Sequence, residues 1–180
     1  MKIPILLISL LIFATFAANA QNAGDYIKDD EIDKFVGTWE WKSGNDYFRI
    51  IISKQKLEGP NFSTGDRFHM DMAICWHIYV KNGITIDSSM DKANKTYTDA
   101  IEAIENCSLS GSAHSQYLSI LYRDKQKDKF GNAKLTMLPG KSDEAKWELR
   151  EWSVAILEPN KPLPIMGYTI PTDVIMKKIN

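Results

Sequence analysis

Apolar and polar residues alternate along most of the chain after residue 37, and this period of two is typical of β-strands. The first two alternating runs are residues 38–42 and 47–53, and the turn-forming residues 43–46 separate them. Together they predict a hairpin with one apolar face. The apolar positions of this face are Trp39, Trp41, Phe48, Ile50 and Ile52.

The longest alternating run covers residues 68–80. Asn82 and Gly83 follow it, and an Asn-Gly pair between alternating segments is a strong hairpin signal. The sequence therefore predicts a second hairpin, which continues at residues 84–86. We expect the more apolar face of the long strand to point into the core; this face consists of Phe68, Met70, Met72, Ile74, Trp76, Ile78 and Val80.

The middle of the chain is harder to interpret. Residues 89–116 combine a helical spacing of apolar residues with many turn formers, so both a short helix across one end of the fold and a poor edge strand are compatible with them. Residues 117–122 and 132–138 again alternate and predict two strands joined by a charged loop.

The last part of the chain predicts two more strands. Residues 147–149 continue the inward series, and the phase then changes, so we expect a β-bulge near residues 150–151. Four prolines within residues 159–171 predict a long loop before a final strand at residues 173–179. Within that loop, residues 161–168 mix prolines with apolar side chains; they could cover the end of the fold, contact a partner protein, or pack as ordinary structure.

About eight strands in succession, with little helix and no internal repeat, predict an all-β, antiparallel up-and-down barrel in which the last strand closes on the first. A two-sheet sandwich is the alternative architecture. We expect one barrel domain at residues 37–180, preceded by a linker and a short helical turn at residues 21–36.

Residues 1–20 have the features of a secretory signal peptide. Lys2 is followed by the apolar run from Ile5 to Phe16, and residues 18–20 form a small-x-small cleavage site. We therefore expect a periplasmic or secreted protein. The apolar run is shorter than the roughly 20 residues that span a bilayer, and no cysteine stands near the cleavage site, so we expect neither a stable membrane anchor nor a lipid anchor.

The composition disfavours nucleic acid as a partner, and it does not decide whether the two cysteines form a disulfide. The formal net charge is −1 and basic residues form no stripe, so nucleic acid is a poor candidate partner. The chain has two cysteines, Cys75 and Cys107. In an oxidising compartment they could form a disulfide, or they could be two small buried apolar residues.

Residues 37–41, Gly-Thr-Trp-Glu-Trp, resemble the Gly-x-Trp entry of lipocalins and related calycins. The longer segment 37–45, the segment 76–83 and the closing segment 170–178 are similar to an uncharacterised family of small secreted Bacteroidota proteins. This resemblance covers most of the mature chain. It implies a lipocalin-like barrel with a short helical turn before it, and it implies no known activity.

No motif predicts catalysis, a metal site or a cofactor. His69 and His77 share a strand face but stand eight residues apart, about 26 Å along an extended chain, too far to ligate one metal ion. Neither a nucleophile elbow nor a phosphate-binding glycine loop is present in the sequence. We therefore expect a non-enzymatic protein, with an enzyme of scattered catalytic residues as a less favoured alternative.

An eight-stranded barrel can be filled by side chains or can hold one small ligand. The predicted inward residues are bulky and include no Arg or Lys, so any ligand inside should be apolar and neutral. The alternative is a filled barrel that serves as an interaction or structural module for another exported protein. The predicted ligand-lining residues are Trp41, Phe48, Ile50, Met70, Met72, Trp76, Tyr122, Met137 and Trp147.

Overall fold

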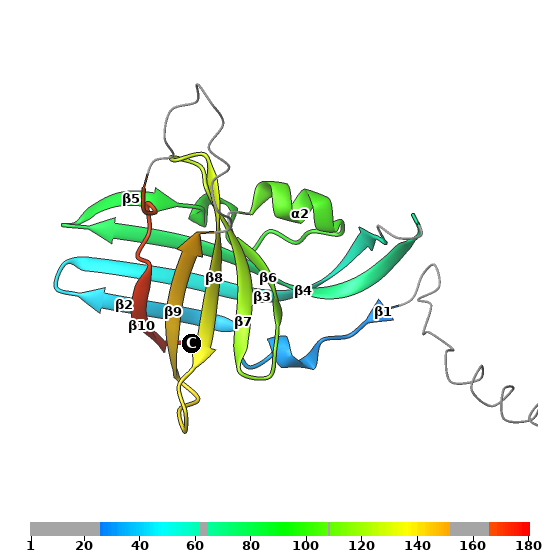
Figure 1. The fold of residues 1–180 in the computed structure, drawn as a ribbon, viewed down its shortest axis with the longest axis horizontal. Helices are drawn as coiled ribbons and strands as arrows, with labels where there is room; N and C mark the ends of the chain where they lie inside the picture. The colour runs from blue at the N-terminus through cyan, green and yellow to red at the C-terminus, as the bar shows by residue number, and fades with distance from the viewer. Residues whose placement is uncertain (1–25, 62–64, 108, 152–165) are drawn as a thin grey trace, which may run out of the picture.

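The computed structural model describes residues 26–61, 65–107, 109–151 and 166–180, and its main body is a closed antiparallel β-barrel (Figure 1). Eight strands form the barrel, and each pairs with its neighbour in the sequence. β4 pairs with β6 in the middle of the series, and the last strand, β10, pairs with β2 to close it. The predicted all-β, up-and-down barrel is therefore confirmed. The barrel strands are β2 (Gly37–Ser43), β3 (Asp46–Pro60), β4 (Arg67–Lys81), β6 (Leu109–Ala113), β7 (Tyr117–Asp124), β8 (Lys129–Met137), β9 (Glu144–Glu151) and β10 (Asp173–Lys178).

Two further strands extend the sheet along the free parts of β4. The two-residue strand β1 (Tyr26–Ile27) pairs with it in parallel, and β5 (Ile84–Ser88) forms the predicted hairpin with it. The register between β4 and β5 shifts at Tyr79 and Val80. The predicted first hairpin is β2 and β3, and the predicted final strand is β10.

The long strand β4 points into the barrel with the opposite face from the one that its sequence predicts. The inward residues are Ala73, Cys75 and His77, whereas Ile74 and Trp76 lie in a separate cluster outside the barrel. The outer face is apolar because it too is buried, and a strand buried on both faces carries no simple alternation of apolar and polar residues. The prediction for Met70, Met72, Trp76 and their companions on this face is therefore wrong.

Residues 89–116 explain what covers the outer face of β4. They contain the 3-10 turn η3 (Met90–Lys92), the helix α2 (Ala100–Asn106) and the strand β6, so the segment holds both a helix and a strand. Asp99 caps the helix, because its carboxylate accepts the backbone N–H groups of Ile101 and Glu102. The helix lies over the outside of β3 and β4 rather than across a barrel end (Figure 1).

Both cysteines are buried free thiols in the structure. Cys75 belongs to the barrel interior, and Cys107 belongs to the outer cluster under α2. The two side chains therefore lie in different apolar clusters, and the structure has the second of the two alternatives, a pair of small buried apolar residues. Cys75 points inward because the whole strand turns the face opposite to the predicted one into the barrel.

The N-terminal turn closes one end of the barrel. Ile32 of the 3-10 turn η2 (Asp30–Ile32) and Phe35 have no solvent exposure and pack in the interior cluster with Trp39. The indole Nε1–H of Trp39 donates to the carbonyl oxygen of Phe35 at 2.8 Å. Trp39 therefore joins the turn to the barrel.

The interior face of β3 also carries one cation at this closed end. Lys54 continues the alternation of Phe48, Ile50 and Ile52, so the expectation that no lysine joins the inward series is wrong. Its Nζ lies 3.3 Å from the carboxylate of Asp71 and 3.1 Å from that of Asp33. The charge of Lys54 is therefore paired, as a partly buried charge requires.

The β-bulge at residues 150–151 is predicted because the inward-facing positions change phase between residues 147–149 and 152–156. Residues 152–156 lie outside the described residues, so the bulge stays a prediction. The proline-containing loop at residues 159–171 is described only from residue 166 onward. Its last part, residues 166–172, runs to the start of β10.

Gly37 permits the closure of β2 against the end of the chain. Its φ is +128°, and a Cβ atom built there would lie 2.2 Å from the carbonyl oxygen of Asn180. That oxygen accepts the backbone N–H of Thr38 at 3.0 Å, and the N–H of Ile179 donates to the carbonyl of Thr38 at 2.8 Å. A side chain at position 37 would push these two segments apart.

We predict that Gly37→Ala lowers the free energy of unfolding by at least about 2 kcal/mol, because it adds a clash with backbone to an unfavourable φ. Urea unfolding followed by tryptophan fluorescence measures the change. Gly44→Ala is the matched control, since Gly44 has a φ of +59° and nothing within 4 Å of the added Cβ; its cost should be about 1 kcal/mol. Equal costs for the two variants would contradict the closure argument.

Candidate functional site

An aromatic cluster fills the barrel interior above the closed end. The rings of Phe48 and Trp147 lie with their centroids 5.4 Å apart, and those of His77 and Tyr122 lie 5.8 Å apart, both in edge-to-face arrangements. None of these four side chains is exposed to solvent. Edge-to-face packing lets the positive edge of one ring meet the negative face of the next, and this attraction fixes how the rings are oriented in the cluster.

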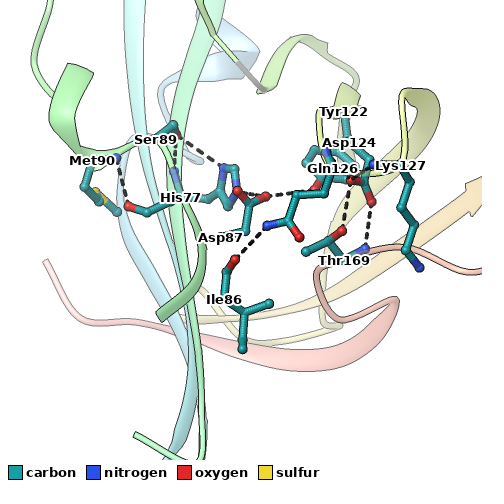
Figure 2. A network of polar contacts seen from close by, with 11 residues as sticks. His77, Ile86, Asp87, Ser89, Met90, Tyr122, Asp124, Gln126, Lys127 and Thr169 are labelled. Atoms are coloured by element: carbon teal, nitrogen blue, oxygen red, sulfur yellow. Dashed lines mark hydrogen bonds and ion pairs between the residues drawn. The ribbon is translucent and has the colours of Figure 1, made fainter. Parts of the chain in front are cut away.

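A chain of hydrogen bonds crosses the top of this cluster (Figure 2). The Oγ of Ser89 lies 3.3 Å from Nδ1 of His77, and Nε2 of His77 lies 3.0 Å from the carboxylate of Asp87. The hydroxyl of Tyr122 donates to the same carboxylate oxygen at 3.2 Å. Because a carboxylate only accepts, we assign the imidazole proton to Nε2, which leaves Nδ1 to accept from Ser89.

The order Ser89, His77, Asp87 matches that of a catalytic triad, but the geometry makes it a structural link. Ser89 is 5% exposed, and its Oγ also accepts the backbone N–H of His77 at 3.0 Å. A substrate carbonyl would have to reach a buried oxygen that already holds two hydrogen bonds. The chain of bonds instead holds β5 and the start of η3 to the inner face of β4.

Two opposing effects set the pKa of Asp87. Burial acts to raise the pKa of this carboxyl, but the hydrogen bonds from His77 and from the hydroxyl of Tyr122 outweigh burial and hold the pKa below its ordinary value. Burial, followed by the charges of Asp87 and Asp124, raises the pKa of the Tyr122 hydroxyl. Tyr122 therefore remains a hydrogen-bond donor and Asp87 an acceptor at neutral pH.

Asp124 is a second buried carboxylate, and it holds the segment before β10 in place. Its side-chain oxygens accept the backbone N–H of Thr169 at 2.7 Å and the Thr169 hydroxyl at 2.9 Å. They also accept the N–H groups of Gln126 and Lys127 at 3.2 and 3.1 Å. These four donors replace the hydrogen bonds to water that the fully buried Asp124 side chain loses. Figure 2 shows this group beside the chain from Ser89 to Tyr122.

The segment that Asp124 holds forms one wall of an open hollow at the end of the barrel opposite η2. The β2–β3 and β4–β5 hairpins lie at this end, which we call the mouth (Figure 1). The hollow has a volume of about 440 Å³. Its lining residues are Trp41, Tyr79, Lys81, Ile86, Tyr168, Thr169, Ile170 and Pro171.

The floor of this mouth hollow rests on the interior cluster. The ring of Tyr79 packs edge-to-face on Phe48 with centroids 6.4 Å apart, and that of Tyr168 packs on Tyr122 at 6.0 Å. Gln126 fixes one side, because its Nε2 donates to the carbonyl oxygen of Ile86 at 2.7 Å. The lining side chains are thus held by packing and hydrogen bonds from below and from the side.

The structure brings together some of the predicted ligand-lining residues and separates others. Trp41 lines the mouth hollow, while Phe48, Ile50, Tyr122 and Trp147 are buried beneath it and Met137 is partly buried against the same cluster. The remaining three, Met70, Met72 and Trp76, lie outside the barrel wall. For Trp41, which lines the mouth hollow, contact with a ligand remains a prediction.

Sequence reasoning missed most of the mouth. Tyr79 and Lys81 stand next to the Asn-Gly turn at residues 82–83. Because a hairpin turn lies at one end of a barrel, this position was a signal that could have placed them there. Asp87, Ser89 and Asp124 carry no such signal, because short polar residues near turns are usually solvated caps.

No group of three or more His, Cys, Asp or Glu side chains among the described residues is placed to hold a metal ion. Within the same residues, no helix has both the length and the apolar character needed to cross a bilayer.

We predict that Asp87→Asn lowers the free energy of unfolding by about 1–3 kcal/mol at pH 7, because His77 and Tyr122 lose a charged acceptor. A carboxyl whose folded-state pKa is depressed stabilises the fold above its unfolded pKa and loses that contribution as pH falls through the folded value. The difference between wild type and variant should therefore shrink below about pH 4. Urea unfolding at several pH values measures it, with Asp128→Asn, an exposed site, as control. A difference that is constant with pH would contradict this assignment.

Comparison with known proteins gives a family and no activity. A family model described as a family of unknown function, DUF6705, matches residues 1–179. No curated protein and no solved structure matches the chain significantly. Because the family model covers nearly the whole sequence, the chain belongs to the DUF6705 family of unknown function.

Proposed function

We propose that this chain is an exported, non-enzymatic, lipocalin-like barrel that binds one small, apolar, uncharged molecule at its mouth. The observation that carries the proposal is the mouth hollow, whose volume of about 440 Å³ falls within the range of ligand pockets. The export part of the proposal is supported by the signal-peptide features of residues 1–20.

The lining of the hollow supports an apolar ligand. Trp41, Tyr79 and Tyr168 supply aromatic surface, and Ile86, Ile170 and Pro171 supply aliphatic surface. The one charged lining residue, Lys81, is exposed and could donate a hydrogen bond to a polar atom of the ligand. Apolar lining with few polar groups is typical of small-molecule sites.

The packing of the interior supports a site at the mouth rather than deep in the barrel. Phe48, Ile50 and Trp147 have no solvent exposure and pack together with other large side chains. A ligand in their place would need to displace side chains that already fill the space at close to crystal density. At the mouth, by contrast, a ligand covers aromatic surface that water now contacts, and this burial favours binding.

Rigidity of the site supports binding further. Asp124 fixes Thr169, and Gln126 fixes Ile86, so opposite walls of the hollow are tied to the same β7–β8 turn. A preformed site loses less conformational entropy on binding than a mobile one does.

The proposal predicts saturable binding of N-phenyl-1-naphthylamine, a neutral apolar fluorescent probe, at one molecule per chain. Ile86→Asp places a charge in the lining and should weaken this binding at least about tenfold, because an apolar probe that covers the carboxylate would remove its hydration. Ile175→Asp is the matched control, since Ile175 is an exposed isoleucine on β10 that does not line the hollow.

Fluorescence titration measures both dissociation constants, and native mass spectrometry gives the stoichiometry. Native mass spectrometry of protein purified from its own host, beside a lipid extract of the same cells, then searches for the natural ligand. Binding that does not saturate, or that both variants weaken equally, would overturn the proposal.

A further inference from the structure

The mouth hollow is lined by three aromatic side chains that come from three different parts of the chain. Trp41 belongs to β2, Tyr79 to β4, and Tyr168 to the segment before β10. All three are partly exposed, whereas interior rings such as Phe48 and Tyr122 have no solvent exposure. The ring surface of the three lining residues is therefore available to a ligand.

Two of these aromatic residues stand on either side of a buried one. Trp41 pairs with Phe48 across β2 and β3, Phe48 pairs with Tyr79 across β3 and β4, and both outer residues pack against the interior cluster. Neighbouring strands lie about 4.8 Å apart, so the backbones at Trp41 and Tyr79 are separated by about 10 Å. Contacts between two rings have centroid distances of about 4.5–7 Å. A single flat ring above Phe48 can therefore contact an aromatic side chain on each side.

Tyr168 is held in place on another side of the hollow. Its hydroxyl donates to the carbonyl oxygen of Phe130 at 2.9 Å, and its ring packs on Tyr122. Gly131 provides room for this ring, because a Cβ atom at that position would lie 2.7 Å from Cζ and from the hydroxyl oxygen of Tyr168. Tyr79 is oriented by its own edge-to-face contact with Phe48. Rings with fixed orientations favour a rigid, flat ligand over a flexible chain, which would lose conformational entropy on binding.

The lining also contains a hydrogen-bond donor that the protein itself does not use. The hydroxyls of Tyr122 and Tyr168 are hydrogen bonded, whereas that of Tyr79 has no partner among the described residues. Burial, followed by the charge of Asp46, raises the pKa of the Tyr79 hydroxyl, which therefore stays protonated at neutral pH. The negative charge of Asp46 also disfavours an anion beside this hydroxyl, and Lys81 is exposed, so water solvates its charge. The matching group on a ligand is thus a neutral acceptor such as a carbonyl oxygen.

We propose that the ligand of the mouth hollow is a neutral molecule with a flat aromatic ring system and a carbonyl oxygen. The ring system lies above Phe48 between Trp41 and Tyr79, and the carbonyl oxygen accepts the hydroxyl of Tyr79. This inference rests on the proposed function, because it specifies what the same hollow binds. It adds two requirements that burial of apolar surface alone does not make, namely aromatic character and one acceptor.

Three related compounds test these two requirements. The compound 2-acetylnaphthalene meets both, 2-acetyldecahydronaphthalene keeps the carbonyl but has no aromatic ring, and 2-ethylnaphthalene keeps the rings but has no acceptor. Equilibrium dialysis against the purified protein measures each dissociation constant. The saturated ketone should bind at least about fivefold more weakly than 2-acetylnaphthalene, because it forms no contact between rings. Equal or tighter binding of the saturated ketone would overturn the proposal, since burial of apolar surface alone favours that compound.

Two substitutions assign each requirement to a side chain. Tyr79→Phe removes only the hydroxyl; it should weaken binding of 2-acetylnaphthalene about three- to tenfold and leave that of 2-ethylnaphthalene unchanged. Trp41→Leu replaces a ring by an aliphatic side chain; it should weaken 2-acetylnaphthalene at least about threefold and the saturated ketone much less. Tyr117→Phe and Tyr117→Leu are the matched controls, because Tyr117 does not line the hollow, and both should leave all three constants unchanged.

The possible outcomes separate this inference from the proposed function. If N-phenyl-1-naphthylamine does not saturate and none of the three compounds binds, the proposed function fails, and this inference fails with it. If the probe saturates but the three compounds bind equally, or Tyr79→Phe acts no differently from Tyr117→Phe, this inference alone is overturned. Far-ultraviolet circular dichroism checks the fold of each variant, and the comparison of compounds on the unchanged protein decides the question even where a variant does not fold.

Discussion

The limited volume inside an eight-stranded barrel determines much of this structure. Such a barrel is only just wide enough for the side chains of its own strands to fill it. Here large side chains such as Trp39, Phe48, Tyr122 and Trp147 occupy that space, and all are fully buried. The strand β4 therefore contributes only small side chains to the interior at positions 73 and 75, namely Ala73 and Cys75. Its first large inward side chain is His77. The bulky residues of β4 must lie on its other face, where α2 covers them.

This constraint explains what could be predicted from the sequence and what could not. Strand positions and closure follow from local signals, namely alternation, turn dipeptides and the entry glycine, and the barrel was predictable from them. The face of β4 depends on two non-local facts: the volume already used by other strands, and a helix in a segment where helical spacing is mixed with many turn formers. Local alternation therefore assigned Trp76 to the wrong side, although it placed Phe48 and Ile50 correctly. The mouth was missed for a similar reason, since Asp124 and Thr169 meet only in the folded chain.

The formal net charge of the protein does not show where its charged side chains lie in the fold. The formal charge of −1 suggests no attraction to anionic partners. In the fold, however, Asp87 and Asp124 turn inward and accept hydrogen bonds from neutral donors rather than from lysines. Among the described residues, Lys125 near them forms no ion pair. The negative charges of both carboxylates still act at that end of the barrel, since they raise the pKa of the Tyr122 hydroxyl.

The same buried carboxylates connect stability at the mouth with its shape. Asp124 holds Thr169, and Asp87 holds His77 and Tyr122, so both walls of the hollow depend on hydrogen bonds to these two side chains. A hollow open to water needs such internal support, because its lining side chains lack packing partners on one side. Closing the hollow with a larger side chain would remove that need, as the fully packed interior below it shows. An open, well-supported end above a filled core thus concentrates the exposed aromatic surface at one place, and this makes the mouth the part of the molecule most suited to binding.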